Sequence, residues 1–224
     1  MSLPAGRILL LGDDNGIIEG PLRHLGAKIV RADCCGGWAD IICDEDRLPF
    51  ADGVFDAVFA CGSLDSVNDL PGALLLARRL LKPDGIFLGS FLGAGTGDGL
   101  REACVRAAGT DRVVARAHPM IDVRAAGDLL ARAGFFEPVA DTEEVKVRYR
   151  SLMPALADRR ANATGNCLSD RAYLSRHQFV SICERVAGSR EGGAGIEDTL
   201  AIMFLTGHAG PHSLGLKETS DVGQ

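Results

Sequence analysis

Short apolar runs recur along the chain and predict the strands of a sheet. Ile8–Leu11 is wholly aliphatic and ends at Gly12, a pattern typical of a parallel strand buried on both faces. Six further runs predict additional strands, at 27–30, 38–43, 54–60, 86–91, 135–139 and 143–149.

Helix signals lie between these runs. Ile17–Leu25 predicts a helix with a proline in its first turns. Asp69 is placed to cap a second helix, which has Pro71 in its first turn and ends at the Pro-Asp-Gly turn at 83–85. Val123–Gly134 predicts a third helix, stopped by its terminal glycine. Strands that alternate with helices in this way indicate an α/β domain with a mainly parallel sheet.

The composition is that of a folded globular chain, and it narrows the choice of partners. Of 224 residues, 46% are hydrophobic and 24% are charged, which excludes a disordered, collagen-like or coiled-coil chain. The net charge of −6 argues against nucleic acid as a partner, because phosphate backbones attract basic surfaces. No apolar run approaches the length of about 18 residues that a transmembrane helix needs. The N-terminus lacks the basic region of a secretory signal, so we predict a cytoplasmic protein.

The cysteines point to the same compartment. There are seven, an odd number without a CxxC pair, which favours reduced thiols over a disulfide framework. Cys34, Cys35, Cys43 and Cys61 fall in one third of the chain, so a metal or redox site is conceivable. Because their spacing matches no zinc pattern, we interpret them as small buried hydrophobic residues and predict no metal.

Two segments carry a family resemblance. Leu48–Asp56 resembles the "LPF-x-x-x-x-FD" segment of class I S-adenosylmethionine-dependent methyltransferases, and Leu80–Gly85 resembles their "LKPGG" turn. The resemblance extends from Arg7 to about Thr206. It is closest to the subgroup that contains the malonyl-carrier-protein methyltransferase of biotin synthesis and the complex I assembly factor that hydroxylates an arginine. The assembly factor is resembled most in 63–89, 128–135, 141–149 and 166–167.

The resemblance implies an α/β, Rossmann-like class I methyltransferase fold. Its sheet is mainly parallel and doubly wound, with an antiparallel last strand. One domain is expected over 1–206, with a small helical insert at 152–188 above the carboxyl edge of the strands and a disordered tail at 207–224. Only ten residues separate Asp33 from Asp44, too few for the family's second-strand helix. Because the first strand starts near Arg7, the family's N-terminal helix is also expected to be missing.

The turn after the first strand departs from the family pattern. Relatives resemble "LDLGCGxG", in which the strand acid attracts the cofactor's ammonium and the glycines let the backbone approach it. Here Gly12 and Gly16 are kept, Leu10 replaces the acid, and Asp14 replaces the middle glycine beside Asp13. Like charges about 4 Å apart cost about 4 kcal/mol at an effective dielectric of about 20. Asp14 therefore either repels the cofactor's carboxylate, points away, or takes over the ammonium contact.

The resemblance assigns the remaining cofactor contacts to strand ends. Asp33 would bind the ribose hydroxyls, and Asp44 or Glu45 would accept from the adenine amine. The alternative for all three is a solvated acid. Cys61 and Ser63, at the end of the fourth strand, are counted with the S-adenosylmethionine contacts.

Further residues are expected on the substrate side. Asp65 stands where relatives have a histidine, as a base or substrate acceptor or as a hydrated loop acid. His118, Tyr149 and Asn166 are candidate substrate contacts; the alternatives are a surface histidine and a strand with one solvated face. The glycine-rich segment at 93–99 is either an anion cradle or, the favoured interpretation, a flexible connection.

Three functions stay open at this level. The first is an active S-adenosylmethionine-dependent methyltransferase acting on a small molecule or a protein. The second is a catalytically degenerate relative that serves as a binding or assembly partner of another protein. The third is an arginine-hydroxylase-like assembly factor. A fold by itself does not choose among them, because function lies in the site.

Overall fold

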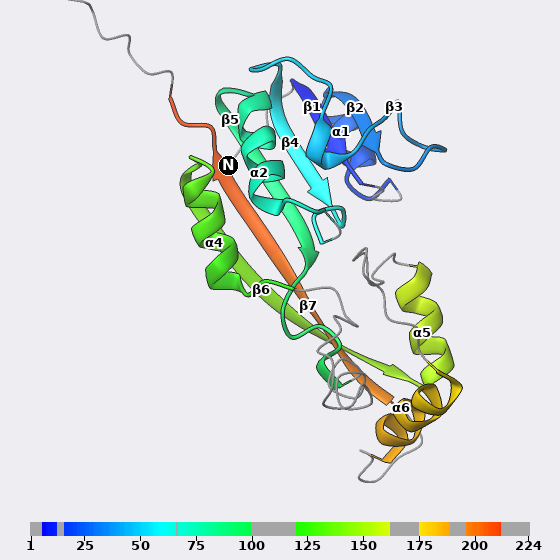
Figure 1. Cartoon of the computed structure of the whole chain (residues 1–224). Helices are drawn as coiled ribbons and strands as arrows, with labels where there is room; N and C mark the ends of the chain where they lie inside the picture. Colours follow the sequence, from blue (N-terminus) through cyan, green and yellow to red (C-terminus); the bar gives the residue numbers. More distant parts are fainter. Residues whose placement is uncertain are drawn as a thin grey trace, which may run out of the picture.

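A computed structural model describes residues 6–12, 16–65, 67–99, 120–161, 175–188 and 196–211. Within them the strands form one sheet in the order β3-β2-β1-β4-β5-β7-β6 (Figure 1). The strands are β1 (Arg7–Leu11), β2 (Lys28–Asp33), β3 (Ile41–Ile42), β4 (Phe55–Cys61), β5 (Leu81–Leu92), β6 (Phe136–Tyr149) and β7 (Ile196–His208). The first five pair in parallel, while β7 runs antiparallel to β5 and β6. The predicted α/β fold with an antiparallel last strand is therefore confirmed.

The described helices are α1 (Glu19–His24), α2 (Leu70–Leu80), α4 (Val123–Arg132), α5 (Leu152–Ala161) and α6 (Arg176–Gly188), with a 3-10 turn, η1 (Glu45–Arg47). Local signals explain where two of them begin. The Asp69 carboxylate accepts from the Gly72 N–H at 3.0 Å and caps α2, as predicted. Asp122 caps α4 in the same way through the Ala125 N–H at 2.8 Å.

Both faces of the sheet are buried, as a doubly wound architecture requires. Leu9 and Leu11 of β1 belong to the larger core, which includes apolar residues of α2 and α4. Leu10, on the opposite face, belongs to a smaller apolar cluster with Leu22 of α1. Strand β1 is thus buried on both sides, which confirms the inference from its wholly aliphatic run.

Several strands differ from their predicted extent. Of the predicted 38–43 strand, only Ile41–Ile42 is in strand register with β2, while the N–H groups of Asp40 and Cys43 donate to the carbonyls of Arg31 and Asp33 beside it. The two strands predicted at 135–139 and 143–149 are one strand, since the residues between them keep their pairing with β7. Strand β5 starts at Leu81, five residues before the predicted start. The segment 34–40 holds no helix, as predicted.

Beyond the end of β5, strands β6 and β7 continue as a two-stranded ribbon (Figure 1). The free edge of β7 there is covered by the glycine-rich segment: the Gly93 and Gly97 N–H groups donate to the carbonyls of Ala201 and Thr199, each at 2.9 Å. The Thr96 hydroxyl accepts from the Ala201 N–H, also at 2.9 Å. Because these N–H groups are already bonded, the segment neither cradles an anion there nor forms a loose connection. Both alternatives given for it are wrong for residues 93–97.

The predicted insert contains α5 and α6, which lie beyond the arrowheads of β4 and β5 in Figure 1. Arg159 of α5 pairs with Asp198 of β7 at 2.8 Å, and both side chains are largely buried. A Cβ at Gly97 would overlap the Arg159 guanidinium, so the absence of a side chain there makes room for this ion pair. Strand β7 reaches His208, two residues past the expected domain boundary at Thr206. The tail at 212–224 lies outside the described residues.

Candidate functional site

The parallel strands bring the predicted cofactor residues to one edge of the sheet. Leu11 of β1 is in register with Ala32 of β2 and with Ala60 of β4. Gly12, Asp33 and Cys61, which follow these three residues, therefore lie abreast at the carboxyl edge. Ligands of doubly wound sheets bind outside this edge.

Gly12 holds the ends of β1 and β4 close together. Its φ is +80°, and a Cβ there would overlap the Cys61 carbonyl oxygen. Only glycine fits this combination of backbone angle and contact. Gly16 also has a positive φ, of +78°, but a Cβ there would meet open space. Asp13 and Asp14 lie outside the described residues, so their effect on a bound carboxylate stays a prediction.

Leu10 stands at the position of β1 where the family pattern has an acidic residue. Its side chain is fully buried in the apolar cluster on the α1 side of the sheet. No other residue of β1, whose sequence is RILLL, carries a carboxylate. An ammonium group at this strand end would have no anionic partner from β1.

Three acids instead gather after β2 and β3. The Asp33 carboxylate accepts from the Cys35 N–H at 2.7 Å, and the Asp44 carboxylate accepts from the Asp46 N–H at 3.1 Å at the start of η1. Glu45 is buried, with 7% of its surface exposed. Burial raises the pKa of its carboxyl, the Ser63 hydroxyl hydrogen bond opposes that shift, and the charges of Asp33 and Asp44 add to it. The structure thus brings Asp33, Asp44 and Ser63 close to Glu45, while their role as cofactor contacts stays a prediction.

The raised pKa of Glu45 makes a testable prediction. The folded state holds the proton of Glu45 more tightly than the unfolded chain does. The contribution of Glu45 to the stability of the folded state is therefore fully present below the usual carboxyl pKa, and it is lost as pH rises through the folded-state pKa. We expect Glu45→Gln to be more stable than the wild type at pH 7. The gap should close towards about pH 4, where the unfolded glutamate also becomes protonated. Urea unfolding at the two pH values measures it.

Asp52→Asn is the control for this experiment. Asp52 is a well exposed acid that pairs with Arg79, and it lies just before the amino end of β4, away from the carboxyl edge. Its stability relative to wild type should change little between the two pH values. A Glu45→Gln variant that is less stable at pH 7, or whose stability gap ignores pH, would contradict the burial argument.

Asp65 also lies at the carboxyl edge, just after β4. Burial raises the pKa of its carboxyl, and backbone hydrogen bonds at Asp65 and Leu92 oppose the shift. The group is therefore partly desolvated, which does not fit the alternative of a hydrated loop acid. A carboxyl group in this condition is a proton acceptor of raised basicity or a partner for a cationic substrate group.

Of the candidate substrate residues, the structure describes only Tyr149. The Tyr149 hydroxyl donates to the Asp158 carboxylate, which fastens the end of β6 to α5. This hydrogen bond is the main cause that raises the pKa of Tyr149 to about 12. Tyr149 therefore serves a structural contact at the far end of the ribbon. His118 and Asn166 lie outside the described residues.

The cysteines differ from their interpretation as buried hydrophobic residues. Cys34 and Cys35 are exposed, and Cys43 and Cys61 are only partly buried. The interpretation is wrong for the first pair, because residues 34–37 after β2 form no helix and are all exposed. All described cysteines are free thiols.

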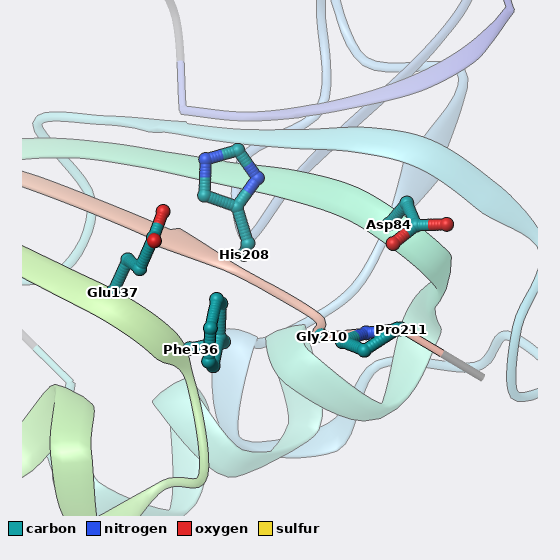
Figure 2. Close-up of a pocket in the computed structure, with 6 residues that line it drawn as sticks. All are labelled: Asp84, Phe136, Glu137, His208, Gly210 and Pro211. Atoms are coloured by element: carbon teal, nitrogen blue, oxygen red, sulfur yellow. The ribbon is translucent and has the colours of Figure 1, made fainter. Parts of the chain in front are cut away.

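The sequence did not predict a shallow depression at the opposite end of the strands, near the start of β5. It has a volume of about 260 Å³ and is lined by Asp84, Phe136, Glu137, His208, Gly210 and Pro211. Figure 2 shows His208 of β7 between Glu137 of β6 and Asp84 of β5. Asp84 and Glu137 both have positive φ angles, of 60° and 49°. The residues that line the depression come from three segments that lie far apart in the sequence. The positive φ angles of Asp84 and Glu137 are the one unusual backbone feature among them.

Known proteins with similar sequences or folds include methyltransferases, whose ligand site is the one expected at this edge of the sheet. Residues 22–89 match the model of a methyltransferase domain family. The mitochondrial arginine hydroxylase of Rattus norvegicus is 37% identical over 174 residues, which are 75% of this chain and 50% of that protein. A solved structure of a candidate methyltransferase from Bacillus halodurans matches with a TM-score of 0.62 and 13% identity, over 93% of this chain and 95% of that one.

This chain therefore has a methyltransferase-like fold and, over residues 22–89, the sequence pattern of a methyltransferase domain. A malonyl-[acyl-carrier protein] O-methyltransferase of Coxiella burnetii is a further relative, 30% identical over 164 residues that make up 72% of this chain and 55% of that protein. The methyltransferase-like chain thus spans about half the length of the curated relatives it matches. Within its described residues, no helix has the length and apolar character that crossing a membrane requires.

Proposed function

We propose that the methyltransferase-like domain binds S-adenosylmethionine at the carboxyl edge of β1, β2 and β4. The observation that carries the proposal is that Gly12 and Asp33 lie at the neighbouring ends of β1 and β2, with Glu45 of η1 close to Asp33 and to Ser63 after β4. When bound, this cofactor supplies an activated methyl group on a sulfonium for transfer to a nucleophile. The chain's own contribution would be to hold and orient the reactants, which is the main source of rate in such a transfer.

The residues present fit the nucleoside end of this cofactor. The Asp33 carboxylate suits a ribose diol, since an ionised carboxylate accepts two hydroxyl hydrogen bonds. Asp44 and Glu45 are suited to accept from an adenine amine. Gly12 lets β1 and β4 lie close together at this edge, because its missing Cβ leaves room for the Cys61 carbonyl. The described residues of β1 provide no anion for the ammonium group, and this end of the site depends on residues beyond the strand.

Calorimetry with S-adenosylhomocysteine tests the cofactor proposal. We expect micromolar binding to the wild-type chain and about 10- to 100-fold weaker binding to Asp33→Asn, because a hydrogen bond to a charged group contributes about 1.5–3 kcal/mol. Asp52→Asn is the matched control and should bind like the wild type, since Asp52 lies at the opposite edge and pairs with Arg79. Absence of heat with the folded wild-type protein would refute cofactor binding and favour a purely partner-binding role.

A second candidate function is an arginine-hydroxylase-like assembly role on a partner protein. It is supported by the 37% identity to the rat arginine hydroxylase and by Asp65. A partly desolvated carboxyl at the substrate side suits a guanidinium, which binds carboxylates in a bidentate fork. Such a hydroxylation would insert one oxygen of O2 into a C–H bond of arginine and reduce the other to water, with two electrons from an external reductant. Mass spectrometry of a co-purifying protein should then show an arginine carrying one extra oxygen. A stable partner with only unmodified arginines would favour the assembly role without chemistry.

The compartment of this activity is a proposal as well. Free thiols at all described cysteines suit a reducing, cytoplasmic location. The arginine hydroxylase of Rattus norvegicus is named as mitochondrial. Fractionation of the native host, followed by immunodetection of the chain, decides between the two compartments.

A further inference from the structure

Three potential metal ligands meet at the end of β2. They are the Asp33 carboxylate and the thiols of Cys34 and Cys35, and their ligand atoms all lie within 4.8 Å of one another. The two sulfurs are 3.8 Å apart. Both cysteines are exposed, so an ion can reach the cluster directly from solvent.

The spacing of the sulfurs matches a tetrahedral thiolate site. Zinc binds cysteine sulfur at about 2.3 Å, and two sulfurs on a tetrahedron of that size are about 3.8 Å apart. A disulfide, by contrast, needs a sulfur separation of about 2.05 Å, so the pair would have to move considerably to form one. The observed arrangement therefore fits a shared ion without rearrangement of the sulfurs.

Local structure holds the third ligand in place. Asp33 is the last residue of β2, and its carbonyl accepts from the Cys43 N–H at 3.0 Å. One oxygen of its carboxylate accepts from the Cys35 N–H at 2.7 Å. The carboxylate is thus oriented towards the segment that carries both thiols.

We propose that Asp33, Cys34 and Cys35 form a binding site for a thiophilic divalent cation of the zinc class. Two thiolates exclude magnesium and calcium, which take oxygen ligands, and favour an ion that prefers sulfur and tetrahedral geometry. Three protein ligands leave the fourth position open to water or to a further ligand. The site uses the segment where the family's second-strand helix is missing.

The site overlaps the proposed cofactor site at a single residue, Asp33. Ion binding would occupy the carboxylate that the cofactor's ribose is proposed to use. The two ligands should then weaken each other's binding, a coupling that is reciprocal by linkage. This consequence rests on the proposed function, while the ion site itself does not.

Titration with Co²⁺ tests the site in the full chain, reduced and free of chelators, without any cofactor present. Cobalt replaces zinc in thiolate sites and reports sulfur ligands by a charge-transfer absorption. We expect one Co²⁺ per chain with this absorption, and its loss on addition of Zn²⁺. Cys34→Ser and Cys35→Ser should each lower the affinity at least about tenfold, since even outer-shell substitutions cost about 10- to 100-fold.

Cys183→Ser is the matched control, because Cys183 lies on α6 at the far end of the ribbon. It should bind Co²⁺ like the wild type. An unchanged absorption in Cys34→Ser, or no thiolate absorption in the folded wild-type chain, would overturn the proposal. Because this titration needs no cofactor, its failure is separate from a failure of the calorimetry with S-adenosylhomocysteine. Competition between the two ligands is expected only if both proposals hold.

Discussion

Leu10→Asp, which restores the acid that relatives carry on the first strand, is expected to destabilise the domain by at least about 4 kcal/mol. Leu10 is fully buried, and its cluster is formed by apolar residues of β1, α1, β4 and β5. Truncating a buried leucine costs about 2–5 kcal/mol. A carboxyl placed in such surroundings without a partner adds several more. The total approaches the entire stability of a typical domain, about 5–15 kcal/mol.

Urea unfolding followed by circular dichroism measures this effect. Leu10→Met is the control, because a swap that conserves volume and polarity usually costs less than about 1.5 kcal/mol. Leu10→Asp should also fail to improve binding of S-adenosylhomocysteine. A variant that folds with near wild-type stability and binds more tightly would show that the side chain at this position reaches the cofactor and not the core.

Gly12→Ala is expected to lower stability by about 3 kcal/mol and to abolish cofactor binding. A left-handed backbone conformation costs an alanine about 1–2 kcal/mol. The overlap of its Cβ with the Cys61 carbonyl adds about 1–3 kcal/mol, as overpacking does elsewhere. Relief of that overlap requires β1 and β4 to separate at the edge where the ligand is proposed to bind.

Gly16→Ala separates the two contributions. Gly16 has nearly the same positive φ, but a Cβ there has no neighbour within 4 Å. It should lose only the backbone part, about 1–2 kcal/mol. Chemical denaturation of both variants gives the stabilities, and calorimetry gives the affinities. Equal losses for the two glycines would mean that the Cys61 contact contributes nothing.

Leu10→Asp and Gly12→Ala test two different features of the turn after β1. Gly12 permits the close approach of β1 and β4. Leu10 gives up the ammonium partner and gains burial on the α1 face of the sheet. The described strand end therefore serves the fold and offers no anion to the methionyl end of a cofactor. Under the proposed function, binding would depend on acids outside β1, such as those after β2 and β3.

Much of the fold could be predicted because its signals are local. The aliphatic run at Ile8–Leu11 marks β1, and Asp69 with Pro71 marks the start of α2. The extent of β6 could not be predicted in this way. Its residues at 140–142 look like a break between two strands, yet they pair with β7, more than 60 residues further along the chain. Pairing partners at such separations leave no trace in local periodicity.

The same distinction between local signals and long-range contacts applies to the candidate site. The sequence by itself determined that Gly12, Asp33 and the acids before Leu48 follow strand ends, because strand runs and turn residues are readable from neighbouring positions. It also determined that Leu10 cannot act as an acid. Only the tertiary structure decided that Glu45 is buried against Ser63, that Tyr149 is held by Asp158, and that Cys34 and Cys35 face solvent beside Asp33. Burial and side-chain proximity depend on which distant segments pack together, and no single segment of the chain contains that information.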